Sequence, residues 1–388
     1  MLLCLGLAVV VAVMAGCGGA GNPGGNNLAV AAAGNVSPMS LDPAAVGTWM
    51  LVSGTSNGVV VAPKNITGWW PGSTRELVAF LGNGTCTDTY YNASGGVVHK
   101  NPGTWSGTGG KGTIHWTTGG TTTPIPFTYT FQGADVITWS FTLAGRKTVC
   151  SWVKIVTLTA HDPALVKTWT ATSVCVNGGV KPLSYLSGNT TYAHFARCFL
   201  ANGTSQRYLL GLDDNQQIKL PKPAPETWAT AGGVLKLDTG PISEQIYTVT
   251  AAQLTTWQLD AAGNTLKIVF APYGWAGAHD ARIVGTWHPV SGKIDGVTKP
   301  IAVVNNWKPG ITSEKDIFRS DGTSECATYA GTTLMQDELD RWYGTGGTIH
   351  IDGIGATVTG SLVFGTGTVT LSFTFGGHTK VIVSAKDS

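Results

Sequence analysis

Short runs in which apolar and polar residues alternate follow one another along the chain and are separated by Gly-rich turns. In the first third, after a run that carries Trp49, they are Leu77–Leu81, Thr85–Tyr91, Gly103–Ser106, Thr113–Thr117, Phe127–Phe131, Val136–Thr142 and Thr148–Ile155. A period of two is that of a half-buried strand, and Asn-Gly or Asp-Gly turns favour hairpins. The pattern predicts about eight short antiparallel strands without intervening helices, which close into an up-and-down barrel. A β-sandwich is the alternative.

One set of landmarks recurs three times. Asp42–Trp49 returns as Asp162–Trp169 and as Asp280–Trp287, so the tryptophans are 120 and then 118 residues apart. Each copy is followed, in the same order, by a Phe-x-x-[Asn/Asp]-Gly-Thr turn, a second tryptophan and a Gly-rich turn into a strand. Repetition at this spacing indicates tandem homologous domains, here 41–157, 158–276 and 277–388.

These landmarks also carry a resemblance to a known family. The segments Gly47-Thr48-Trp49, Phe80–Thr85, Gly103-Thr104-Trp105 and Thr113-Ile114-His115 resemble the bacterial lipocalin-like domain. The resemblance covers 41–156 and 277–388 best, and the middle repeat departs from it with Lys167 in place of the first glycine. It implies three tandem small antiparallel lipocalin-like β-barrels, in which Trp49, Trp169 and Trp287 are structural plugs at the closed ends.

The N-terminus has the features of a targeting segment. Leu2–Ala15 is apolar apart from Gly6, too short to cross a bilayer comfortably but of signal-peptide length. Met14-Ala15-Gly16-Cys17 resembles a bacterial lipobox, which implies a signal peptide at 1–16 and lipidation of Cys17; a cleaved signal without lipidation is the alternative. Residues 17–40, rich in Gly, Asn and Ala, predict a flexible tether. We expect an extracytoplasmic lipoprotein, anchored in a membrane of the bacterial cell envelope and either periplasmic or on the cell surface.

Five cysteines lie beyond the targeting segment: Cys86, Cys150, Cys175, Cys198 and Cys326. They form no Cys-x-x-Cys pair and no zinc-type spacing. In an oxidising compartment we expect the disulfides Cys86–Cys150 and Cys175–Cys198. Cys326 is then left over, either as a buried free thiol or as one end of an intermolecular bridge.

The sequence contains no recognisable catalytic motif. A Gly-x-Ser-x-Gly elbow, a P-loop and His-Glu-x-x-His are all absent, so we predict neither an enzyme nor a cofactor nor a metal site. The net charge of +2, without Lys/Arg clusters, argues against a nucleic-acid partner. The acidic run Gln336–Asp340 is predicted to be an exposed loop, with calcium binding as the alternative.

Aromatic residues in the connection after the first strand are the most suggestive feature for function. Trp69 and Trp70 have a counterpart in Trp307 and a weaker one in Tyr185. In a lipocalin-like barrel this connection crosses the open mouth, where aromatic rings bind a small hydrophobic ligand or a glycan. Alternatively, they cover the core of a barrel that its own side chains fill. The sequence thus predicts a non-enzymatic binder of small hydrophobic ligands, with a solid structural or adhesion-like interaction module as the alternative.

Overall fold

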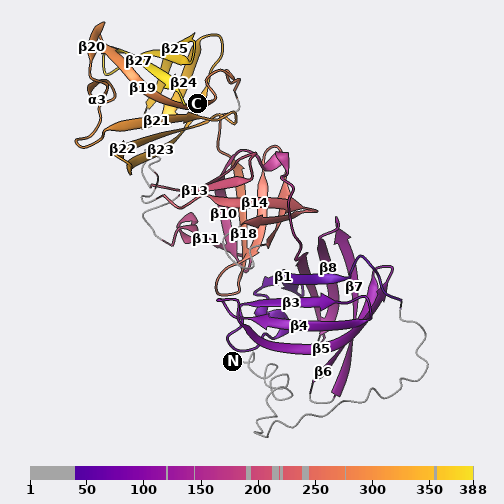
Figure 1. Cartoon of the computed structure of the whole chain (residues 1–388). Helices are drawn as coiled ribbons and strands as arrows, with labels where there is room; N and C mark the ends of the chain where they lie inside the picture. Colours follow the sequence, from indigo (N-terminus) through magenta and orange to yellow (C-terminus); the bar gives the residue numbers. More distant parts are fainter. Residues whose placement is uncertain are drawn as a thin grey trace.

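The computed structural model describes residues 40–118, 121–143, 145–188, 194–211, 218, 222–237, 244–275, 277–353 and 356–387. In this part the chain forms three successive β-sheets, which follow one another in a row (Figure 1). We name them barrels 1, 2 and 3. No helix among the described residues is long and apolar enough to cross a membrane.

The three barrels share one order of elements. Barrel 1 contains β1 (Gly47–Ser56), β2 (Val59–Val61), α2 (Lys64–Thr67), β3 (Arg75–Phe80), β4 (Thr85–Tyr91), β5 (Val97–Thr108), β6 (Lys111–Thr118), β7 (Thr121–Gln132), β8 (Val136–Leu143) and β9 (Arg146–Lys154). Barrel 2 contains the 3-10 turn η1 (Pro163–Leu165), β10 (Thr168–Val176), β11 (Gly179–Lys181), the 3-10 turn η2 (Leu183–Leu186), β12 (His194–Phe199), β13 (Thr204–Leu210), β14 (Glu226–Ala231), β15 (Val234–Leu237), β16 (Glu244–Val249), β17 (Leu254–Leu259) and β18 (Thr265–Pro272). Barrel 3 contains β19 (Gly285–Ile294), β20 (Val297–Lys299), α3 (Ile301–Val304), β21 (Ser313–Phe318), β22 (Thr323–Ala330), β23 (Thr333–Tyr343), β24 (Thr348–Gly353), β25 (Ala356–Gly365), β26 (Thr368–Phe375) and β27 (His378–Lys386).

Each sheet closes on itself through its first strand. The strand β1 pairs with β3 at its beginning and with β9 along its length, and β10 and β19 do the same with their own neighbours and last strands. Eight strands therefore form each closed antiparallel barrel, while the short β2, β11 and β20 pair only with the end of the first strand. Closure removes the free edges that would template aggregation. The predicted fold class is confirmed, and the β-sandwich is excluded.

Aromatic side chains fill the apolar part of the interior of barrel 1. Its buried cluster includes Trp49, Phe80, Trp105, Trp139 and Trp152, all fully or almost fully buried. The ring centroids of Trp139 and Trp152 are 4.4 Å apart, and those of Phe80 and Trp105 are 4.8 Å apart. Barrels 2 and 3 have smaller clusters built around Trp169 and Trp228, and around Trp287 and Trp342. Aromatic rings whose centroids lie this close to one another stabilise a protein core.

The barrels are docked on one another through buried surfaces. Barrels 1 and 2 share one apolar cluster, made of Met50, Val52, Leu77, Val136 and Val153 with Val234 and Ile246. The hydroxyl of Thr265 in barrel 2 also donates to the Val52 carbonyl of barrel 1 at 3.0 Å. A second cluster joins Cys198, Tyr208 and Leu210 of barrel 2 to Leu339 of barrel 3. Some side chains on the outer face of one barrel are thus buried against the next barrel and belong to the core of the whole chain.

Candidate functional site

A tryptophan and a glutamate form the same contact at one mouth of barrels 1 and 3. The short helices α2 and α3 lie in the connection between the first barrel strand and the next, and the tryptophan that follows each helix donates its indole N–H to a carboxylate on that next strand. The distances are 2.6 Å from Trp69 Nε1 to Glu76 Oε2 and 2.5 Å from Trp307 Nε1 to Glu314 Oε2. Both glutamates are buried inside their barrels, and both tryptophans are half-buried. Two of the predicted ligand-binding residues therefore lie over polar interiors.

Each of these glutamates accepts a second hydrogen bond from the same connection. Thr67 Oγ1 donates to Glu76, and Asn305 Nδ2 donates to Glu314 Oε1 at 2.7 Å. Burial raises the pKa of Glu76 well above its ordinary value and raises that of Glu314, although the hydrogen bonds act in the opposite direction. The spacing of seven residues between tryptophan and glutamate, common to repeats 1 and 3, was the sequence signal that could have found this pair.

The polar interior of barrel 1 continues below Glu76. Asp88 on β4 is buried, and burial raises its pKa to about 7, while hydrogen bonds from Tyr90 and Asn101 work against this rise. His99 and Asn101 on β5 are joined by a 2.7 Å hydrogen bond. The ring of Trp70 lies on that of His99, with centroids 3.8 Å apart. Trp70 is therefore held against the barrel wall by its own barrel's side chains.

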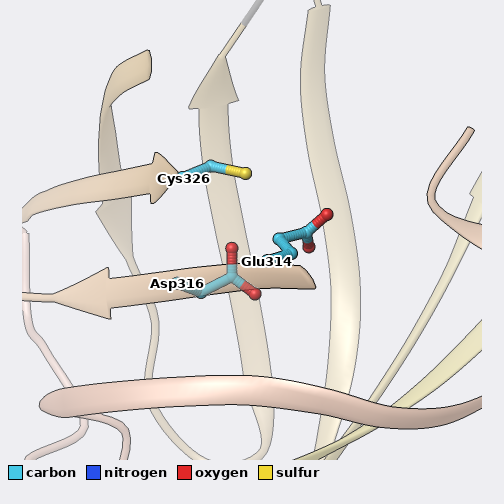
Figure 2. Close-up of side chains that lie close together, drawn as sticks. All are labelled: Glu314, Asp316 and Cys326. Carbon is cyan, nitrogen blue, oxygen red and sulfur yellow. The ribbon is translucent and has the colours of Figure 1, made fainter. Parts of the chain in front are cut away.

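Barrel 3 has a more acidic interior at the corresponding height. Asp316 on β21 is directly opposite Cys326 on β22, which is directly opposite Glu338 on β23. The side chains of Glu314, Asp316 and Cys326 project from two adjacent strands (Figure 2). One ligand atom from each of these three residues lies within 4.8 Å of the others. Asp340 follows Glu338 on the same face of β23 and is buried. Two carboxylates, one thiol and two further acids thus face one interior.

The predicted exposure of the acidic run Gln336–Asp340 is wrong. These residues belong to β23, and Asp337 to Asp340 are all buried. Because side chains alternate between the faces of a strand, Glu338 and Asp340 face the interior of barrel 3, whereas Asp337 and Leu339 face barrel 2. One face of β23 is thus covered by the interior of barrel 3 and the other by barrel 2, whereas its acidic composition predicted an exposed segment.

Barrel 2 has arginines in its interior. Phe195 stands where barrels 1 and 3 have the mouth glutamate, four residues before the paired Phe199. Glu226 pairs with Arg197 at 2.6 Å and with Arg207 at 2.8 Å. Tyr185, the predicted ligand-binding residue of this repeat, is exposed, and its hydroxyl donates to Asp260 Oδ2 at 3.0 Å. The middle repeat therefore lacks the tryptophan–glutamate contact.

The three residues predicted to plug the barrels have one environment in common. Trp49, Trp169 and Trp287 are buried, and each indole N–H donates to a backbone carbonyl four residues earlier, at 2.8, 2.9 and 2.6 Å. A lysine Nζ lies 5.1 to 5.3 Å from each ring centroid. These are contacts of core residues with satisfied polar atoms.

The two predicted disulfides are absent: the five cysteines among the described residues are free. On β10 and β12, Cys198 is opposite Thr168, whereas Cys175 is opposite Val180 and Lys267. Seven residues of strand separate the two positions, which corresponds to about 23 Å and is far beyond the reach of a disulfide. Cys86 and Cys150 are both buried in the core of barrel 1 as thiols, and burial raises the pKa of Cys86 to about 12. The number of cysteines in the sequence does not reveal how far apart they lie in the fold.

Cys17, the predicted lipidation site, lies outside the described residues. A groove of about 980 Å³ lies beside β5 to β9 and is lined mainly by Ser, Thr, Gly and Lys residues. Its lining includes none of the four aromatic residues that were predicted to bind a ligand.

No protein-family model matches the chain, and no curated protein matches it. Among solved structures it is similar to a double mutant and a single mutant of transferrin binding protein B from Haemophilus parasuis Hp5, at 8% and 7% identity and TM-scores of 0.19. In both cases the similarity covers 87% of this chain and 75% of the other. The isotype 1 transferrin binding protein B from serogroup B Neisseria meningitidis is 9% identical, with a TM-score of 0.17 over 88% of this chain and 76% of the other. TM-scores of this size do not establish a shared fold or function.

Proposed function

We propose that the protein is a non-enzymatic interaction module of the bacterial cell envelope, tethered to a membrane through lipidated Cys17 and binding a protein or a glycan through its outer surface. The observation that carries this proposal is the filled interior of the barrels, above all the packed rings of Trp105, Trp139 and Trp152. A calyx for a small ligand needs a cavity of about 300–1,000 Å³ lined mainly by apolar groups. The groove beside β5 to β9 reaches this volume but is open to solvent, and the interior of barrel 1 is occupied by its own aromatic side chains.

The charge of the mouths argues in the same direction. The spaces below Trp69 and Trp307 are lined by Glu76 and by Glu314 with its acidic neighbours. An apolar ligand placed beside these already buried acidic groups would offer them no hydrogen bond and would keep water away from them, which is unfavourable. A small hydrophobic ligand therefore has little favourable surface at these two mouths.

Docking of the barrels gives an interaction module a defined shape. Apolar clusters and polar contacts between neighbouring barrels fix their relative positions. The barrels follow one another in a row (Figure 1). Buried contacts at both junctions would hold residues on the outside at constant spacings. A partner that contacts two barrels at once would lose little conformational entropy from the protein on binding.

The test is native mass spectrometry of the full chain purified from its source in detergent. We expect the mass of the lipid-modified chain without a co-purified apolar molecule, and loss of the lipid mass in Cys17→Ser. Titration with an apolar fluorescent probe is expected to show no saturable binding. A bound small molecule, or saturable probe binding that Trp69→Ala and Trp307→Ala abolish, would overturn the proposal in favour of a ligand carrier.

A further inference from the structure

The fold of barrel 3 itself fixes the positions of two carboxylates and a thiol on its inner wall. Glu314 and Asp316 are two residues apart on β21 and so share a face, and Asp316 is the direct cross-strand partner of Cys326. One ligand atom of each lies within 4.8 Å of the other two. Strand register, rather than a loop, holds this arrangement (Figure 2).

We propose that this wall binds one divalent transition-metal ion of the zinc class through Glu314, Asp316, Cys326 and Asp340. Zinc binds thiolate sulfur at about 2.3 Å and carboxylate oxygen at about 2.0–2.2 Å, which places neighbouring ligand atoms about 3–4 Å apart. In the observed cluster, the ligand atoms of Glu314, Asp316 and Cys326 lie within 4.8 Å of one another, and Asp340 is on the same inner wall. The sulfur ligand favours zinc or cobalt over calcium and magnesium, which prefer oxygen alone.

Asp340 provides an independent indication of a missing partner. It is 7% exposed, and its Oδ1 accepts no hydrogen bond within the described part of the chain. It lies opposite Ser324, on the face of the sheet that carries Cys326, and its charge acts on both Asp316 and Cys326. A buried carboxylate oxygen without a partner is costly, and a cation at the centre of the cluster would supply that partner.

Two hydroxyl groups beside Cys326 are, like Asp340 Oδ1, buried and unpaired among the described residues. Ser324 Oγ and Thr328 Oγ1 lie on either side of Cys326 along the same face of β22. Both are buried and have no hydrogen-bond partner among the residues that the structure describes. Buried polar atoms are normally satisfied by protein or by water. Several such atoms on one wall mark a place where a polar occupant belongs.

Three acidic groups on this wall have no cationic partner among the described residues. Over the described ranges, no Lys, Arg or His forms an ion pair with Glu314, Asp316 or Asp340. Barrel 2 differs, because its interior Glu226 meets two arginines. Burial accordingly raises the pKa of Asp316 well above its ordinary value, and also that of Cys326.

Barrel 1 offers an internal control. Its register places Glu76, Val78 and Asp88 where barrel 3 has Glu314, Asp316 and Cys326, since Val78 pairs with Asp88 as Asp316 pairs with Cys326. One ligand is replaced by an apolar side chain and the thiol is replaced by a carboxylate. Barrel 1 keeps the tryptophan–glutamate contact but lacks the mixed sulfur and oxygen donor set, so we expect it to bind no such ion.

The test uses the full chain after removal of metals with a chelator, titrated with cobalt(II). We expect a near-ultraviolet cobalt–thiolate charge-transfer band that saturates at one equivalent and is bleached by zinc. Calorimetry with zinc should give one site, with affinity reduced at least tenfold in Asp340→Asn and the cobalt band lost in Cys326→Ser. The control variants Glu76→Gln and Cys86→Ser should bind as the unmodified chain does.

Circular dichroism establishes that each variant is folded, and Asp340→Asn keeps the test decisive if Cys326→Ser does not fold. The proposal is overturned if no cobalt band forms, or if the band persists in folded Cys326→Ser. It is equally overturned if Asp340→Asn binds zinc with unchanged affinity, or if Cys86→Ser removes the band.

Discussion

Lys154 lies over the ring of Trp49, with its Nζ 5.3 Å from the ring centroid. The two residues are directly opposite each other on β1 and β9. On its way to the indole the lysine passes Gly47, where an added Cβ would lie 2.5 Å from Lys154 Cε. Barrel 3 repeats this arrangement with Lys386, Trp287 and Gly285. The glycine of the repeated signature therefore makes room for the lysine of the last strand.

The glycine and the lysine should be energetically coupled. We expect Gly47→Ala to destabilise barrel 1 by about 1–3 kcal/mol, because the backbone at φ 146° is strained for other residues and because the methyl group meets Lys154. Lys154→Ala alone should cost about 0.5–1 kcal/mol through loss of the cation–π contact. Chemical denaturation of the two single variants and the double variant measures the coupling. If the effects simply add, the proposed steric relationship is absent.

The middle repeat explains why this relationship was not visible in the sequence. There Lys167 occupies the glycine position, and Pro272 occupies the position of the last-strand lysine. Lys167 Nζ still lies 5.1 Å from the Trp169 ring. The cation above the plug is thus supplied by the residue that directly precedes β10, instead of by the last strand of the barrel. A departure from the pattern of repeats 1 and 3 in one position is thus accompanied by a second departure more than 100 residues away, and only the closed barrel brings the two positions together.

Fold and site differed in how far the sequence could predict them. Period-two alternation and repeated turns are local signals, so the strands Thr85–Tyr91 and Val136–Leu143 could be predicted closely. The acidic interior could not, because composition places carboxylates such as Glu338 and Asp340 on the surface. The sequence shows that Glu338 and Asp340 alternate with Leu339. It does not show that Leu339 is covered by barrel 2, which leaves the two acids facing the interior of barrel 3.

Barrel 1 should become less stable as the pH rises toward neutrality. The pKa of Asp88 is raised to about 7 in the folded state, chiefly by burial, against about 3.9 in an unfolded chain. Glu76 shifts in the same direction. The folded state therefore binds more protons between these values, so the stability contributed by protonated Asp88 is complete below about pH 4 and is lost as the pH rises through about 7.

Hydrogen exchange resolved by peptide, corrected for intrinsic rates, separates barrel 1 from its neighbours. The opening free energy of β3 and β4 should fall from pH 5 to pH 8, and Asp88→Asn should flatten this dependence, since an amide keeps the hydrogen bond from Tyr90 and does not titrate. Strands of barrel 2 serve as the reference. An unchanged pH dependence in the folded variant would show that Asp88 is not responsible.

The free cysteines should be detectable chemically. We expect a thiol reagent to titrate five groups in the denatured chain of 40–388 without added reductant. Reductant should leave the thermal unfolding temperature unchanged, because no covalent link constrains the unfolded state. The reaction of the native chain should be slow at Cys150, which is buried and has a raised pKa. Three or fewer titratable thiols would restore a disulfide to the protein.

The contact between Trp69 and Glu76 should contribute to stability rather than to binding. Trp69→Phe keeps an aromatic ring over the mouth but removes the indole N–H that Glu76 accepts at 2.6 Å. Loss of a hydrogen bond to a buried group costs about 1–3 kcal/mol. Trp275→Phe, which keeps a ring stacked on Tyr343, is the matched control and should have a smaller effect on unfolding. Equal effects of the two variants would remove the special role of the indole N–H.

Barrels 2 and 3 should separate when Glu325 loses its charge. Glu325 lies at their interface, accepts a 2.9 Å hydrogen bond from Tyr208 and pairs with Lys222 and Arg319. Burial tends to raise its pKa, but the two cations outweigh burial and lower the pKa to about 2. The carboxylate is therefore charged throughout the physiological range. Glu325→Gln leaves the buried Arg319 without its carboxylate and Lys222 with Asp337 alone, at a cost of about 3–5 kcal/mol.

This cost falls on docking, because Tyr208 and Lys222 belong to barrel 2 whereas Glu325 and Arg319 belong to barrel 3. Small-angle scattering of the full chain should show a broader distribution of interbarrel distances in Glu325→Gln, with faster hydrogen exchange in β13 and β22. Asp295→Asn, which removes an exposed pair with His378, should leave both measurements unchanged. If Glu325→Gln scatters as the unmodified chain does and exchanges no faster, the apolar cluster around Leu339 holds the barrels together without these charges.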